Sequence, residues 1–172
     1  MGFSTPIASS IILIAFTILV SMLSHTLVME AHTLSQVMNK NIVEEASRLG
    51  VILELNITAI NATDDTINFV LRNKGSHTIF LKNQGYIRND VIVAYNISNT
   101  KWISQIASYE VLKIRVPNTG MVFYPTSHLY LAPGEEALIQ VKVNGLEPGS
   151  IVNVVFVSHY GVTAQAEGVA SQ

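Results

Sequence analysis

The residues that could perform acid–base or metal chemistry are five histidines and a few adjacent acidic pairs. His25 and His32 lie seven positions apart, which on a helix separates them by ~10 Å along the axis. That distance is too long for two ligands of one metal ion. Asp64-Asp65 and Glu135-Glu136 are neighbours in sequence, so in a strand or turn their side chains diverge, and we interpret both pairs as solvated surface.

The other histidines, His77, His128 and His159, have no obvious partner in the sequence. His159 follows an apolar run and is interpreted as the end of a strand. The chain has no cysteine, no Gly-x-Ser-x-Gly nucleophile motif and no phosphate-binding loop. We therefore predict no catalytic residue, no metal site and no cofactor, and we expect that the protein is not an enzyme and has no small-molecule substrate.

Three Asn-x-Ser/Thr sequons are the clearest chemical signals, and they make Asn56, Asn61 and Asn96 candidates for N-glycosylation. Their number can also follow from the general abundance of Asn, Ser and Thr. If the sequons are used, the part of the chain that carries them lies outside the cytoplasm.

The charged residues are unevenly placed along the 172 residues. There are 10 basic and 12 acidic side chains, and none of them lies between Met1 and Met29. The small net charge of −2 and the lack of a basic run give no footprint for nucleic acid. With 49% hydrophobic residues, the chain is also too apolar to be disordered throughout.

The uncharged leader, residues 1–29, is predicted to be a transmembrane helix. A cleaved signal peptide fits poorly, because no basic residue precedes the apolar run and the run is too long. Ser and Thr within it can bond to carbonyls one turn back. The predicted membrane anchor comprises Ile7, Ile11, Ile12, Leu13, Ile14, Phe16, Ile18, Leu19 and Val20.

Residues 30–50 are predicted to continue this helix as an amphipathic stem. Apolar residues such as Leu34, Val37 and Met38 recur at helical spacing, and Gly50 provides a stop. Such a stem can lie against its own domain or pair with a second copy, and the sequence leaves both open.

Residues 51–172 are predicted to form an extracellular all-β domain, an immunoglobulin-like β-sandwich. Short segments rich in β-branched and aromatic residues alternate with turns that contain Gly, Pro and Asn. The predicted strands are 51–58, 66–72, 78–82, 91–97, 110–116, 137–143 and 151–158.

Two apolar groups are candidates for a partner or dimer surface. One is Ile87, Val91 and Val93 on a possible edge strand, and the other is Met121, Phe123 and Tyr124. Packing in the core is the alternative interpretation of each group.

The layout of helix, stem and sandwich resembles the FlaF/FlaG family of archaellum (archaeal flagellum) accessory proteins. Residues 1–12 are closest to the start of the F members, and the turn Asn73-x-Gly75 is a second shared motif. The junction Gly2-Phe3 also resembles the site cut by prepilin peptidases, although the basic residues that normally precede it are absent. A pilin-like or G-type subunit that polymerises into a filament is therefore the alternative, and a ligand-binding module on a membrane stalk is a third hypothesis.

The resemblance implies a stator component of the archaellum, with a role in motility. Such a protein is a single-pass membrane protein whose sandwich lies in the pseudo-periplasm, binds the surface-layer (S-layer) protein and braces the rotary motor. The paralogous G protein is a further expected partner, and a homodimer is expected because two attachments gain from effective concentration.

Overall fold

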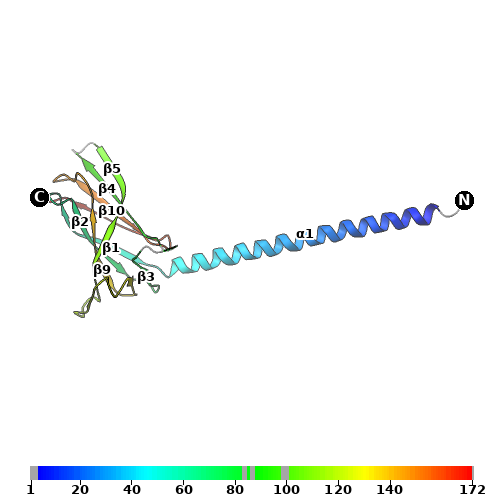
Figure 1. The fold of residues 1–172 in the computed structure, drawn as a ribbon, viewed down its shortest axis with the longest axis horizontal. Coiled ribbons are helices and arrows are strands. Elements are labelled where there is room, and N and C mark those ends of the chain that lie inside the picture. The colour runs from blue at the N-terminus through cyan, green and yellow to red at the C-terminus, as the bar shows by residue number, and fades with distance from the viewer. Residues whose placement is uncertain (1–3, 83–84, 86–87, 98–100, 172) are drawn as a thin grey trace. The chain divides into compact units, whose positions relative to one another are not determined.

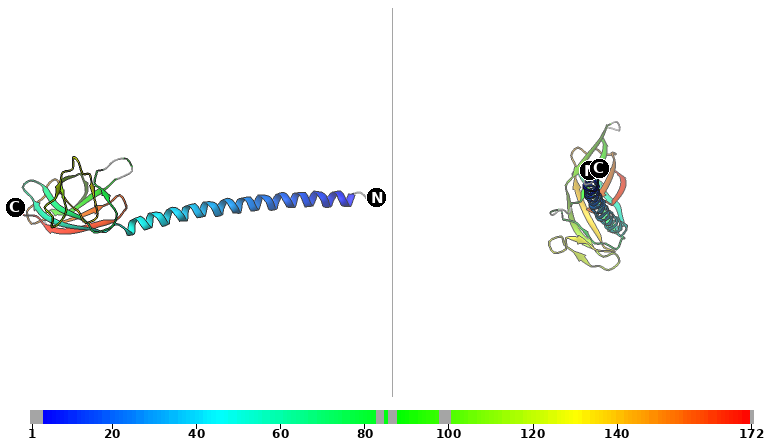
Figure 2. Two further views of the ribbon diagram at one scale, coloured as in Figure 1. Left: turned by 90° about the horizontal axis from the view of Figure 1, so that it is seen from below. Right: turned by 90° about the vertical axis from the view of Figure 1, so that its right-hand side faces the viewer.

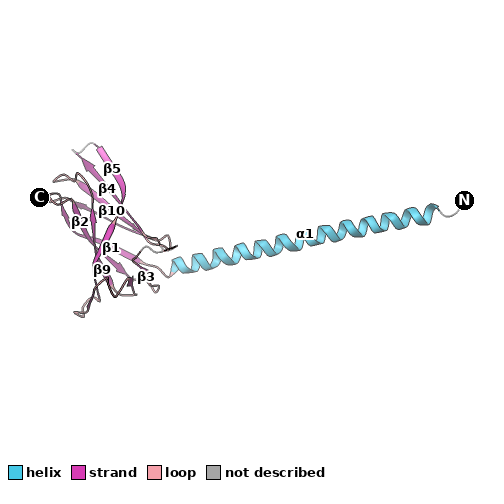
Figure 3. Cartoon of the chain, in the orientation of Figure 1, coloured by secondary structure: helices cyan, strands magenta, loops and turns pink. Residues whose placement is uncertain are grey.

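The computed structural model describes residues 4–82, 85, 88–97 and 101–171, and within its helix the side chains at 4–12, 15, 27, 28, 31, 39, 41–44, 46 and 47 lie outside the description. The chain divides into two compact units, Met1–Glu45 and Ala46–Gln172. Figure 3 shows that the first unit is helical and that the strands lie in the second.

The helix α1 runs without interruption over Ser4–Leu49. Pro6 lies in its first turn, where no backbone donor is needed. The hydroxyls of Thr17, Thr26 and Thr33 donate to carbonyls three or four residues earlier at 2.8–3.0 Å, which satisfies these polar groups locally. The helix continues through residues 30–49, and Gly50 follows its last turn.

The predicted anchor residues with described side chains all lie exposed on α1, with Leu13 and Phe16 at 68% and 65%. Ile7, Ile11 and Ile12 lie outside the described side chains. In the described part of the chain, no helix combines the length and the apolar character needed to cross a membrane. The predicted transmembrane segment is therefore not confirmed. The exposed anchor side chains are Leu13, Ile14, Phe16, Ile18, Leu19 and Val20.

The second unit is an antiparallel β-sandwich (Figures 1 and 2). A five-stranded sheet has the order β1-β2-β9-β6-β7, a four-stranded sheet has the order β11-β10-β4-β5, and β3 pairs with β8. The strands are β1 Leu53–Asn61, β2 Thr66–Asn73, β3 Ile79–Phe80, β4 Asp90–Ile97, β5 Lys101–Ala107, β6 Tyr109–Arg115, β7 Val122–Phe123, β8 Tyr130–Leu131, β9 Glu136–Lys142, β10 Ile151–Val157 and β11 Thr163–Val169.

Each predicted strand overlaps an observed one, so the predicted β-sandwich is confirmed. The strands β5, β7, β8 and β11 were not predicted from the sequence. Two of them have only two residues, and the middle of β11 consists of Ala, Gly, Gln and Glu, which have weak strand preference. The strand β5 contains a Trp and two Ile residues, which are residue types that favour strands.

The core lies between the two sheets and follows the two-residue period of the strands. Phe69, Ile139 and Ile114 from the larger sheet and Tyr95 and Phe156 from the smaller are almost fully buried. The Tyr95 hydroxyl donates to the carbonyl of Asn144 at 2.6 Å, which satisfies the one polar atom of this large side chain.

The turn after β2 is built around Asn73, whose side chain is fully buried. Its amide nitrogen donates to the carbonyls of His77 and Leu131 at 2.7 and 2.9 Å, and its oxygen accepts from the backbone of Gly75 at 3.0 Å. A Cβ at Gly75 would lie 2.3 Å from the carbonyl oxygen of Gly50, so only glycine fits there. The Asn73-x-Gly75 motif thus packs the end of β2 against residues 50–52, which lead into β1.

Candidate interaction surfaces

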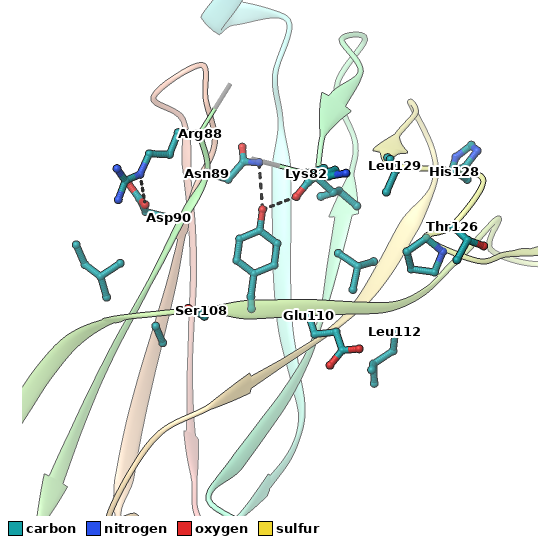
Figure 4. Close-up of a pocket in the computed structure, with 16 residues that line it drawn as sticks. Lys82, Arg88, Asn89, Asp90, Ser108, Glu110, Leu112, Thr126, His128 and Leu129 are labelled. Atoms are coloured by element: carbon teal, nitrogen blue, oxygen red, sulfur yellow. Dashed lines mark hydrogen bonds and ion pairs between the residues drawn. The ribbon is translucent and has the colours of Figure 1, made fainter. Parts of the chain in front are cut away.

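A cavity of about 710 Å³ lies where the chain leaves β5 and enters β6 (Figure 4). The single residue Ser108 separates these strands, which belong to different sheets. Ile106, Leu112 and Leu129 give the cavity apolar walls, and Lys82, Arg88 and Glu110 contribute charges.

Tyr109 also lines this cavity, and its hydroxyl is held by two hydrogen bonds. The Tyr109 hydroxyl donates to the carbonyl of Leu81 at 2.5 Å and accepts from the side-chain nitrogen of Asn89 at 3.3 Å. Burial raises the pKa of Tyr109, with a smaller opposing effect from the Asn89 hydrogen bond. The phenol therefore remains a neutral structural donor at ordinary pH.

Asn89 extends this network to the end of β10. Its nitrogen also donates to the carbonyl of Phe80 at 2.6 Å, and its oxygen accepts from the backbone of His159 at 2.9 Å. Burial lowers the pKa of His159, which favours the neutral imidazole. The predicted strand-end position of His159 is confirmed, because β10 ends at Val157.

At the cavity mouth, Arg88 bonds to Asp90 at 3.1 Å across an exposed surface. Within the described residues, no group of three or more His, Asp or Glu side chains could hold a metal ion. The arrangement of satisfied polar groups and apolar walls suits contact with a polypeptide.

His128 is buried beside the cavity. It stacks on Phe123 with ring centroids 4.6 Å apart, and its Nε2 lies 3.0 Å from a carboxylate oxygen of Glu135. The same Glu135 oxygen accepts from the backbone of Ala132 at 2.7 Å. His128 therefore does have a partner, contrary to the prediction from the sequence.

The interpretation of Glu135-Glu136 as solvated surface is wrong. The two residues are only 7% and 9% exposed. Glu136 opens β9 and forms a salt bridge with Arg115 on the neighbouring strand β6. Sequence adjacency did not reveal these partners, because they come from other segments of the fold.

The predicted partner patch is corrected in part. Val91 and Val93 are fully buried, because these positions of β4 point into the core. Ile87 lies outside the described residues. Met121 and Tyr124 are exposed at 61% and 66%. Phe123 is half-buried and packs against the core and His128.

The outer face of the four-stranded sheet carries apolar residues that the sequence analysis did not select. Trp102, Ile106 and Val169 are 59%, 66% and 63% exposed. Trp102 pairs with Asn96, and Ile151 pairs with Val169, so one row of this face crosses all four strands. If residues 101–107 had been predicted as a strand, Trp102 and Ile106 would have been placed on the same face of it.

The three sequons lie in different surroundings. Asn56 is exposed in the middle of β1, and Asn61 is half-buried at the last position of this strand, where its nitrogen donates to Asp64 at 2.7 Å. Asn96 is 5% exposed and accepts a hydrogen bond from the backbone of Ile151 at 2.6 Å. The sequons therefore differ in how accessible their nitrogen atoms are.

The comparison with protein families covers nearly the whole chain. The model of archaeal-type flagellin matches residues 2–168. The chain belongs to the archaeal-type flagellin family. The resemblance to archaellum proteins seen in the sequence is thereby confirmed. Among curated proteins, none is significantly similar to this flagellin-family chain.

Two solved structures of archaellum proteins from Sulfolobus acidocaldarius are similar to it. The periplasmic stator protein FlaG is 19% identical, with 69% of this chain and 99% of that chain covered and a TM-score of 0.44. The stator complex of FlaF and FlaG gives 20% identity, coverage of 67% and 87%, and a TM-score of 0.43.

Proposed function

We propose that this flagellin-family protein is a stator component of the archaellum. Its helix anchors it in the cell membrane, and its β-sandwich lies in the pseudo-periplasm, binds the surface-layer protein and braces the rotary motor. The observation that carries the proposal is the match to the family over residues 2–168, in a chain that consists of one helix and one β-sandwich. A stator element transmits force by binding and needs no chemistry of its own.

The exposed apolar residues of α1 support the anchor. Leu13, Phe16 and Met22 are each more than 60% exposed, and burying such a side chain in an apolar medium is worth about 1.5–3 kcal/mol. Replacing Ile18 and Leu19 by Lys should move the protein from the membrane fraction to the soluble fraction. Unchanged sedimentation with membranes would argue against this anchor.

The outer face of the four-stranded sheet is the proposed contact for the surface-layer protein. The test is binding of purified surface-layer protein to the immobilised unit Ala46–Gln172. Val169→Asp should weaken binding strongly, whereas Met121→Asp, at a similarly exposed apolar site, should not. No binding by the wild-type unit would refute the tether.

A pilin-like filament subunit is the second candidate, and the family match favours it. Deleting the gene separates the two. Loss of a stator component leaves assembled filaments that do not rotate, whereas loss of a subunit removes filaments. A mature N-terminus at Phe3, found by sequencing the protein from membranes, would also support the subunit.

The paralogous G protein and a second copy of the chain are the proposed archaellar partners. Copurification of differently tagged chains from membranes tests the homodimer directly. Recovery of one tag only would exclude it.

The accessible sequon Asn56 is the proposed glycosylation site, because its side chain is exposed on β1. Asn61 is the weaker candidate, and Asn96 is expected to stay unmodified because its side chain is buried. Glycopeptide mass spectrometry of the native protein tests this order. A glycan on Asn96 alone would contradict it.

A further inference from the structure

The strand β5 is an open edge of the four-stranded sheet. It ends the order β11-β10-β4-β5, and Figure 1 labels it at the margin of this sheet. Its pairing with β4 is continuous from Val91↔Ala107 to Ile97↔Lys101, without a bulge. Edges of this kind are normally protected by bulges, prolines or several charges. Lys101 at its first position is the only charged residue in β5.

The outward-facing side chains of this edge are apolar. Trp102 and Ile106 are 59% and 66% exposed and lie on the same face, with Ser104 between them. Two large apolar residues separated by a small central one form a pattern that is complementary to itself when a second strand runs antiparallel.

We propose that β5 binds β5 of a second copy of this chain, so that the two four-stranded sheets join into one. The pairing is antiparallel about a twofold axis at Ser104. Trp102 of each copy then lies opposite Ile106 of the other, an aromatic and β-branched pair of the type that stabilises sheets. The two Ser104 side chains meet at the axis.

The charges at the two ends of the edge fit this arrangement. Antiparallel pairing brings Lys101 of one copy opposite Ala107 of the other. Glu110 lines the same cavity as Ala107 and is exposed, and it forms no salt bridge within the described part of the chain. Lys101 of each copy thus approaches Glu110 of the other copy, and this pair of opposite charges occurs at both ends of the interface.

The inference rests on the homodimer in the proposed function and assigns its contact surface. Val91 and Val93 do not form that surface, because both side chains are buried in the hydrophobic core. Edge pairing also leaves Val169 of β11 at the far side of each sheet. The β11 end of the outer face proposed for the surface-layer protein therefore lies at the opposite edge of the sheet from the dimer contact at β5.

The absence of cysteine allows a disulfide test in the full-length chain. Directly opposed residues of antiparallel strands have Cα atoms about 4.5–5.5 Å apart, which suits a disulfide. Ser104→Cys should give a covalent dimer on mild oxidation of membranes, whereas Ser127→Cys, an exposed serine in a loop, should not. A mixture of Trp102→Cys and Ile106→Cys chains with different tags should give the mixed disulfide in preference to either self-disulfide.

A second test changes association without cross-linking. Ile106→Lys should weaken self-association of the full-length chain about tenfold. Val169→Lys, at the equally exposed opposite edge, should leave it unchanged. Association is measured by copurification of two tags and by light scattering in detergent.

The outcomes separate this inference from the homodimer itself. A dimer that forms normally, is insensitive to Ile106→Lys and gives no Ser104 disulfide overturns the β5 interface and leaves the homodimer standing. A chain that is monomeric in both assays overturns both. The mixed disulfide together with the loss caused by Ile106→Lys supports the interface and its register.

Discussion

At the residue scale, the polar side chains inside this domain serve to hold the fold. Tyr109, Asn89 and Asn73 each satisfy backbone groups from distant segments. Unsatisfied buried polar atoms cost free energy, so each of these residues is tied to its partners. These bonds place the β5–β6 crossover and the turn after β2.

Replacing Tyr109 by Phe should lower the free energy of unfolding by about 1–3 kcal/mol, because the carbonyl of Leu81 and the amide of Asn89 lose a partner. Urea unfolding followed by circular dichroism measures the change. Tyr124→Phe, at an exposed tyrosine, is the matched control and should have little effect. Equal stability of the two variants would show that the hydroxyl of Tyr109 contributes nothing.

The lowered pKa of His159 leads us to expect that the folded domain loses stability in mild acid. Its pKa in the folded protein is below the ordinary value of 6.5, because burial disfavours the charged ring. Below pH 6.5 the unfolded chain therefore binds more protons than the folded chain at this site, and stability falls as the pH falls toward the folded pKa. The stability difference between pH 8 and pH 5 should shrink in His159→Asn, and an NMR titration should place the imidazole midpoint below 6.5.

At the element scale, edges and turns decide which residues can make contacts. Bulges interrupt β1 between Ile57 and Ala59 and β6 between Val111 and Lys113. The edge strand β5 has an unbroken register and exposed apolar residues. The unbroken register and the two exposed apolar residues of β5 are the features on which the proposed dimer edge rests.

Gly75→Ala should destabilise the domain by roughly 3 kcal/mol, because the added carbon would overlap the backbone of Gly50 and Ile52. Gly120→Ala is the control. It has a left-handed φ of 51° but open space around it, so it should cost only about 1 kcal/mol. Thermal unfolding of both variants tests the order, and a larger effect at Gly120 would contradict the steric explanation.

At the scale of the whole molecule, the sandwich has its own core. The buried residues that form this core all lie between Val51 and Ala170. The helical unit Met1–Glu45 contributes no residue to this core.

The fragment Ala46–Gln172 should fold without the preceding helix, because its core contains every buried hydrophobic residue of the described chain. It should show strand-type circular dichroism and a single cooperative unfolding transition. A fragment that is expressed but gives a random-coil spectrum would show that the helix is needed for folding.

The sequence by itself determined the order and type of the main elements. Apolar periodicity and turn residues are local signals, so the long helix, its end at Gly50 and the strands around Phe69, Tyr95, Ile139 and Val154 could be predicted. The family resemblance came from the first residues and from the Asn73-x-Gly75 turn in the same way.

Only the tertiary structure decided which side chains are available for binding. The burial of Val91, Val93 and Asn96, the pairing of His128 with Glu135 and the open edge at β5 all depend on which strands become neighbours. Strand neighbours come from segments far apart in the chain, and no local pattern records them. For this reason the architecture could be predicted from local patterns, whereas the exposure of Val91 and Val93 could not.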